Sequence, residues 1–148
     1  MLTMRERRSK HLGALIVLLC LFSLRVLSQL IQRIWTVDFL PAFEVWHSAT
    51  LGYEVLLGSQ LLILAWLLLV IRGVRGGRIR CTLRKARWLL GLGGVYFAFM
   101  LFRLVMGLTI AEEGSWFDHP LPAAFHLVLA LFVLCHGHYH LTHRSAQP

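Results

Sequence analysis

Four long apolar segments set the strongest limit on what this chain can fold into. Each has about 17–23 residues, enough for an α-helix to cross the roughly 30 Å hydrocarbon layer of a bilayer. Their apolar residues are continuous and do not alternate with polar ones, which excludes transmembrane β-strands. The sequence therefore predicts an all-α membrane protein, a single bundle of four transmembrane helices covering residues 1–148. The predicted spans are about residues 12–31, 55–71, 88–110 and 121–139.

The composition supports this class of protein. Of the 148 residues, 57% are hydrophobic and only 15% are charged, yet the formal net charge is +8. Soluble domains rarely combine these values, and the apolar content excludes intrinsic disorder. Positive charge would also suit a nucleic-acid binder, but no aromatic residue interleaves the basic residues that precede Trp88. We therefore expect no nucleic-acid partner.

The charged residues divide between the two sides of the predicted membrane. Of the fifteen Lys and Arg, four precede the first span, seven lie between the second and third spans, and Arg144 follows the fourth. Only one acidic residue, Glu6, is on that side. Because short basic loops stay in the cytoplasm, we expect an inner (cytoplasmic) membrane protein with both termini cytoplasmic. The other acids lie in or beside the opposite loops: Asp38, Glu44, Glu54, Glu112, Glu113 and Asp118.

The two halves of the chain share a pattern. In each, a span carries an arginine in its outer half and is followed by an acid, a Leu-Pro-Ala motif ending in Phe, and a second span. Both halves run in the same direction, which predicts a parallel tandem of two helical hairpins. Proline also suits the first turn of any helix, so the motif has a simpler explanation too. The matching residues are Arg25, Asp38 and Leu40-Pro41-Ala42-Phe43, and Arg103, Asp118 and Leu121-Pro122-Ala123-Ala124-Phe125.

Ionisable side chains occur at membrane depth in all four spans. Arg25 lies just past the middle of the first span, on a helical face that also carries Ser28 and Gln29. Arg103 lies about seven residues, or roughly 10 Å, inside the outer end of the third. An arginine at this depth is costly, so both should face the bundle or a wet cavity.

These groups suggest two roles. An outward-open polar pocket would bind a lipid headgroup, a carboxylate or a quinone oxygen, since arginine recognises such groups well. Alternatively, the two arginines pair with nearby carboxylates and hold the bundle together. The candidate ligand-binding residues are Arg25, Arg103, Glu54, His126, Asp38 and Asp118.

Histidines form a second candidate site. His126 and His140 share one face of the fourth span, about 21 Å apart along the helix. One bis-histidine haem could use His47 with His126, and another His11 with His140. This spacing, with His47-Ser48 followed by Gly52, resembles four-helix di-haem b cytochromes, and the resemblance implies haem b as cofactor. However, His11 and His47 stand at the ends of predicted helices, whereas haem ligands project from within a bundle.

The histidines near the C-terminus suggest a metal site or a helix end. His136, His140 and His143 share a helical face, and histidines spaced at i and i+4 can bind one metal. No carboxylate or second thiolate lies nearby in sequence to complete the ligand set. A weakly basic helix end, which suits the helix dipole, is the simpler interpretation.

The loop between the second and third spans is strongly basic. The segment 72–87, from Arg72 to Arg87, carries seven positive charges and no acid, which should attract anionic lipids at the membrane surface. We also expect the chain to contact the lipid bilayer itself. A protein partner would be a larger membrane complex or a second copy of the chain. Four glycines within the spans are expected to permit close helix packing: Gly58, Gly91, Gly93 and Gly94.

No motif in the chain indicates an enzyme, since Walker, GxSxG and HExxH patterns are all missing. We favour a non-enzymatic accessory subunit or a binder of an amphipathic or anionic ligand, a lipid or a quinone. The alternative is a membrane redox protein that carries haem b or uses quinone. A third option is a small transporter, which would have to oligomerise to enclose a path.

Overall fold

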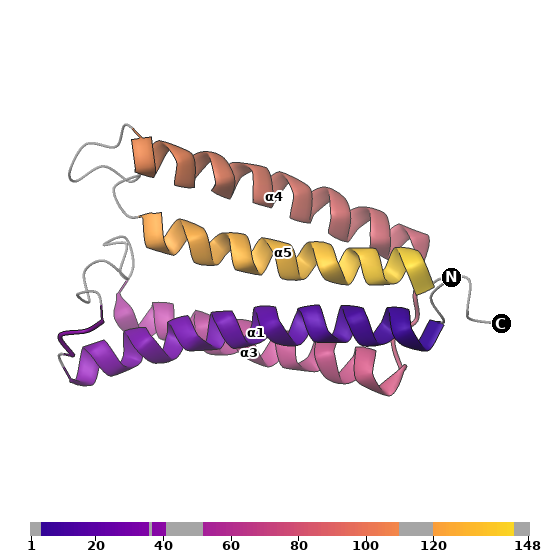
Figure 1. The fold of residues 1–148 in the computed structure, drawn as a ribbon, viewed down its shortest axis with the longest axis horizontal. Coiled ribbons are helices and arrows are strands. Elements are labelled where there is room, and N and C mark those ends of the chain that lie inside the picture. Colours follow the sequence, from indigo (N-terminus) through magenta and orange to yellow (C-terminus); the bar gives the residue numbers. More distant parts are fainter. Residues whose placement is uncertain (1–3, 36, 41–51, 110–119, 144–148) are drawn as a thin grey trace.

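The computed structural model describes residues 4–35, 37–40, 52–109 and 120–143. Within these ranges the chain forms four α-helices (Figure 1). All four are long and apolar enough to cross a membrane, which confirms the predicted all-α class with four candidate spans. The helices are α1 (Met4–Ile34), α3 (Tyr53–Gly76), α4 (Leu83–Thr109) and α5 (Pro120–His143).

The helices extend beyond the predicted spans, mainly at the ends that carry basic residues. Helix α1 begins at residue 4 rather than 12, α3 ends at 76 rather than 71, and α4 begins at 83 rather than 88. Arginine and lysine are good helix formers, and their long side chains can reach water from the end of a membrane helix. Hydropathy therefore marks the apolar part of each helix but not its full length. Residue 110 of the predicted third span lies outside the described residues.

Helix α5 lies between α4 and α1, and α3 packs against α1 (Figure 1). Helix α1 begins, and α5 ends, at the end of the bundle where the chain passes from α3 to α4. We call this end the basic end, because most of the described arginines and lysines lie there. They are Arg5, Arg7, Arg8, Lys10, Arg72, Arg75, Arg78, Arg80, Arg84, Lys85 and Arg87.

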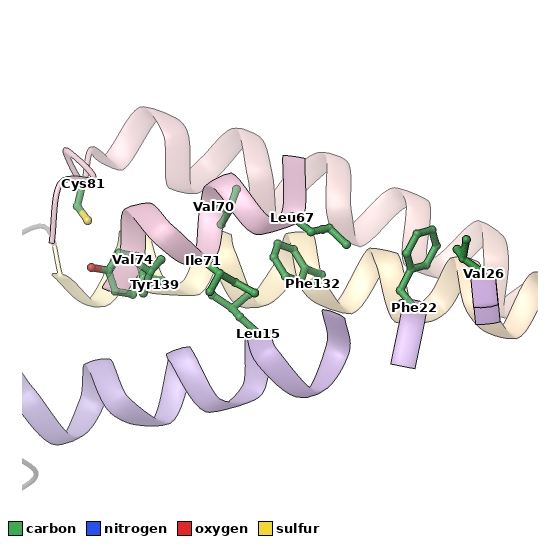
Figure 2. Close-up of a cluster of buried hydrophobic side chains, with 10 residues drawn as sticks. All are labelled: Leu15, Phe22, Val26, Leu67, Val70, Ile71, Val74, Cys81, Phe132 and Tyr139. Carbon is green, nitrogen blue, oxygen red and sulfur yellow. The ribbon is translucent and has the colours of Figure 1, made fainter. Parts of the chain in front are cut away.

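A cluster of buried apolar side chains joins α1, α3 and α5 (Figure 2). Leu15 of α1, Leu67 of α3 and Phe132 of α5 are almost completely buried in it. Helix α4 buries only a narrow strip of its surface. The small or apolar residues of this strip recur every seven positions, at Ala86, Gly93 and Met100. Many large apolar side chains elsewhere on the helices remain exposed, as expected for helices that face lipid.

Two glycines allow α4 and α5 to approach closely. A Cβ atom on Gly93 would lie 3.1 Å from side-chain atoms of Leu134 and Val133, and one on Gly137 would lie 3.0 Å from Leu89 and Leu90. The expectation of close packing is therefore confirmed at Gly93. It was wrong at Gly58, Gly91 and Gly94, where an added Cβ would meet nothing within 4 Å. The spacing of glycines does not reveal which side of a helix has a neighbour.

A glycine also ends α3 and fixes the following loop. Gly77 adopts the left-handed conformation, with φ of 64°, and its N–H donates to the carbonyl of Val74. The N–H of Arg78 donates to the carbonyl of Gly73, which completes the hydrogen-bond pattern of a Schellman cap. The Arg8 side chain donates to the carbonyl of Arg75. The start of α1 is thereby tied to the end of α3.

Candidate functional site

The first group of polar side chains, which we call the arginine cluster, consists of Arg25, Tyr96, Arg103, Phe125 and His126. It lies in the half of the bundle away from the basic end. Arg25 of α1 is 7% exposed and Arg103 of α4 is 5% exposed, and both act electrostatically on His126 of α5. The guanidinium of Arg25 lies 5.5 Å from the centre of the Phe125 ring, a cation–π contact. Tyr96 and His126 are 2.6 Å apart through the hydroxyl and Nδ1.

The polar face of α1 carries Arg25 into the bundle. Ser28 and Gln29, one turn further along, are buried on the same face. Gln60 of α3 donates from Nε2 to Oε1 of Gln29 over 3.1 Å. Further along α1, Arg33 is exposed and lies 5.8 Å above the ring of Tyr53. The predicted polar face is therefore buried where it meets α3 and α5 and emerges towards the end of the helix.

The structure brings together some of the candidate ligand-binding residues. Arg25, Arg103 and His126 gather around α5. Glu54 and Asp38 both lie on the exposed surface, Glu54 in the first turn of α3 and Asp38 after the end of α1. Asp118 and His47 lie outside the described residues.

Sequence reasoning missed two members of the buried polar network. Gln60 is a lone amide among apolar residues of its span, which is itself a signal of interior facing. Tyr96 lies seven residues before Arg103 and therefore on the same face of α4. Tyr96 could have been found by looking for polar groups in phase with Arg103, and Gln60 by looking for polar groups inside an apolar span.

A second group, the histidine cluster, lies at the basic end and comprises His11, His136, His138, Tyr139, His140 and His143. Nε2 of His11 lies 2.9 Å from Nδ1 of His138, and the rings of His11 and His143 are 5.5 Å apart. His136 and His140 lie one turn apart with ring centres separated by 4.9 Å.

These contacts bear on the histidine hypotheses. His11 contacts His138 and His143, whereas the ring neighbours of His140 are His136 and Tyr139. The haem pair of His47 with His126 stays a prediction, because His47 lies outside the described residues. Among the residues that the structure describes, no three His, Cys, Asp or Glu side chains are grouped so that they could hold a metal ion. The metal site and the basic helix end both stay predictions for these histidines.

Two of the cavities at the basic end adjoin the loop between α3 and α4. One, of about 620 Å³, lies between α1, the 77–82 loop and the end of α5, and is lined by Arg5, Arg8 and Cys81 among others. Burial raises the pKa of the Cys81 thiol, and the nearby Lys85 charge opposes this rise. The other, of about 1010 Å³, lies between α3 and α4.

Comparisons with protein-family models, with curated proteins and with solved structures give no match for this chain. The functional inference is therefore carried by the residues themselves.

Proposed function

We propose that this chain is a small multi-pass protein of the inner (cytoplasmic) membrane, with the basic end and both termini in the cytoplasm. The four apolar helices support a membrane location. The gathering of basic residues at one end of the bundle supports the orientation, since basic loops are retained in the cytoplasm.

Reporter fusions test this orientation. Green fluorescent protein fused after Pro148 should fluoresce, because it folds in the cytoplasm, and alkaline phosphatase at the same position should be inactive. A fusion at Asp38, in the opposite loop, should give the reverse result. Active phosphatase at Pro148 would overturn the orientation.

We also propose that the chain is a parallel tandem of two helical hairpins, α1 with α3 and α4 with α5. In support, each of these pairs packs together, and the two buried arginines belong to the first helix of each pair. The Pro41 motif of the first half lies outside the described residues, so the comparison of the two motifs stays a prediction.

The function that the site supports best is non-enzymatic binding of an anionic or oxygen-rich amphiphile, a lipid headgroup or a quinone, at the arginine cluster. The observation that carries this proposal is Arg25, which is buried in an apolar helix while its Nε has no hydrogen-bond partner among the described residues. Arginine keeps its charge, and a buried charge is costly unless acceptors satisfy it. Phosphate, carboxylate or quinone oxygens would supply such acceptors beside Arg103 and His126.

Native mass spectrometry of the protein purified in mild detergent tests this proposal. We expect a co-purifying lipid or quinone that is lost from Arg25→Met and Arg103→Met. The matched control is Arg33→Met, which removes the same charge from an exposed position on α1 and should retain the ligand. If the two buried variants keep the ligand and lose only thermal stability, the arginines hold the bundle together and the binding proposal fails.

The same preparation decides the alternatives. A haem b protein would show a Soret absorption band, and its expected ligand pairs are His47 with His126 and His11 with His140. An accessory subunit would co-purify with a larger membrane complex, whereas a small transporter would form a homo-oligomer. A bound lipid or quinone and no Soret band is the result that we expect.

A further inference from the structure

The larger cavity at the basic end has an open side between two helices. Its volume is about 1010 Å³, and α3, the 77–82 loop and α4 surround it, with α5 as the floor. Helices α3 and α4 are not among the helix pairs that pack extensively, although the loop between them joins them at this end of the bundle (Figure 1). The cavity therefore faces the lipid side as well as the water at this end of the bundle.

Basic side chains form the mouth of this cavity. Arg78 and Arg80 come from the loop, and Arg84 and Lys85 from the first turn of α4. All four are exposed, and the described lining contains no acidic residue. Such a mouth attracts anions, and its guanidinium groups are suited to phosphate oxygens.

The walls of the cavity are apolar and include two tryptophans. Trp66 and Leu69 come from α3, and Trp88 and Leu89 from α4. Trp88 is 62% exposed and lies one turn after the basic residues Arg84 and Lys85 on the same helix. Tryptophan is enriched where the headgroup layer meets the hydrocarbon layer. A soluble anion would leave these walls uncovered, whereas a lipid would cover them.

Two buried histidines form the floor. His136 is 8% exposed and His140 is 2% exposed. Both ring nitrogens of His136 and Nδ1 of His140 are buried without a hydrogen-bond partner among the described residues. A neutral imidazole carries one donor and one acceptor, and leaving them unsatisfied in an apolar surrounding costs free energy. These unsatisfied nitrogens are a second, independent observation in favour of a ligand with acceptor oxygens.

We propose that this cavity binds one anionic phospholipid. Its phosphate lies among the four basic side chains of the mouth, its acyl chains lie along Trp66, Leu69 and Trp88, and an oxygen of its glycerol ester region accepts a hydrogen bond from the His136 ring. The site lies at the opposite end of the bundle from the arginine cluster. It is therefore additional to the function proposed above and does not depend on it.

Native mass spectrometry of the full chain with dioleoyl phosphatidylglycerol, and with dioleoyl phosphatidylcholine as the zwitterionic comparison, tests the proposal. We expect one phosphatidylglycerol molecule to be retained in preference to phosphatidylcholine. The double variant Arg84→Gln/Lys85→Gln should weaken phosphatidylglycerol binding roughly tenfold. The matched control is Arg72→Gln/Arg87→Gln, which removes the same charge at the same end outside this cavity and should weaken binding less than about threefold.

A second variant tests the floor. His136→Phe keeps an aromatic ring but removes both nitrogens, so it should weaken the binding of both lipids, because both carry the glycerol ester oxygens. The preference for phosphatidylglycerol, which the basic side chains of the mouth determine, should remain. Glycerol 3-phosphate at equal concentration should not displace the lipid, because it lacks the acyl chains that cover the walls.

Several outcomes would overturn the proposal. Equal binding of the two lipids would show that the basic side chains of the mouth do not recognise the headgroup. Equal losses in the two double variants would show only diffuse attraction to a basic surface. Displacement by glycerol 3-phosphate would assign the site to a soluble phosphate. The ligand of the arginine cluster should be lost from Arg25→Met and kept in Arg84→Gln/Lys85→Gln, so failure here and failure at the arginine cluster are distinguishable.

Discussion

The hydroxyl of Tyr96 lies 2.6 Å from Nδ1 of His126, and this hydrogen bond joins α4 to α5 beside two buried arginines. The two rings are nearly perpendicular, with an interplanar angle of 78° and centres 6.1 Å apart. Since Nδ1 is occupied by Tyr96, Nε2 is the ring nitrogen of His126 that a ligand in the arginine cluster would contact. The hydrogen bond thus fixes the orientation of the one imidazole in this cluster.

Removing the Tyr96 hydroxyl should weaken the α4–α5 contact. We expect Tyr96→Phe to lower the free energy of unfolding by about 0.5–1.5 kcal/mol, because it leaves a half-buried imidazole nitrogen without its partner. Thermal unfolding in detergent, followed by circular dichroism, measures this. In a His126→Phe background the same change should have almost no effect, and an equal loss in both backgrounds would contradict the assigned hydrogen bond.

The Gln29–Gln60 hydrogen bond should couple α1 to α3. Gln60→Leu removes the donor, and we expect a loss of about 0.6 kcal/mol, typical of hydrogen bonds between membrane helices. The double variant Gln29→Leu/Gln60→Leu should lose less stability than the sum of the single variants, since neither amide is then left unsatisfied. Ser59→Leu, at the exposed neighbouring position, is the control and should change the melting temperature little. Strictly additive losses would show that the two amides act independently.

Close packing at Gly93 makes this position sensitive to side-chain size. Gly93→Leu would push against Leu134 and Val133, so we expect a loss of about 1–3 kcal/mol in unfolding free energy. Gly91→Leu is the matched control on the same helix, because nothing lies within 4 Å of its added Cβ. Leucine has the higher helix propensity, and the control should therefore be neutral or slightly stabilised. Equal melting temperatures for the two variants would contradict the described α4–α5 packing.

The sequence predicts the elements of this fold better than their partners, for a physical reason. A bilayer requires long apolar helices with satisfied backbones, so hydropathy reveals the four spans directly. Periodicity likewise placed Arg25 and Gln29 on one buried face. It does not specify which helix covers that face, because α5 lies between α4 and α1 through packing of the whole bundle. For this reason the contact of His11 with His138 was not foreseen.

The same limit applies to the sites. Arg25, Arg103 and His126 were selected from their depth in the spans, and depth is readable from the sequence. The larger cavity at the basic end exists because α3 and α4 do not pack against each other. Such a separation between two helices produces no periodic pattern in the sequence. The loop charges alone predicted attraction to anionic lipid. Only the structure places Trp66 and His136 beneath them.

The thiol of Cys81 should react slowly in the folded protein. It is 8% exposed, and burial raises its pKa, although Lys85 opposes the rise. Because the thiolate is the nucleophile, a raised pKa means a smaller thiolate fraction at neutral pH and a slower reaction with N-ethylmaleimide. In Cys20→Ser/Cys135→Ser protein, the labelling rate at Cys81 should be well below that of the same protein unfolded in dodecyl sulfate. It should still be rising with pH where the unfolded thiol has levelled off. Lys85→Gln should slow labelling further, since it removes the charge that favours the thiolate, and equally fast labelling of folded and unfolded protein at neutral pH would contradict the buried position of Cys81.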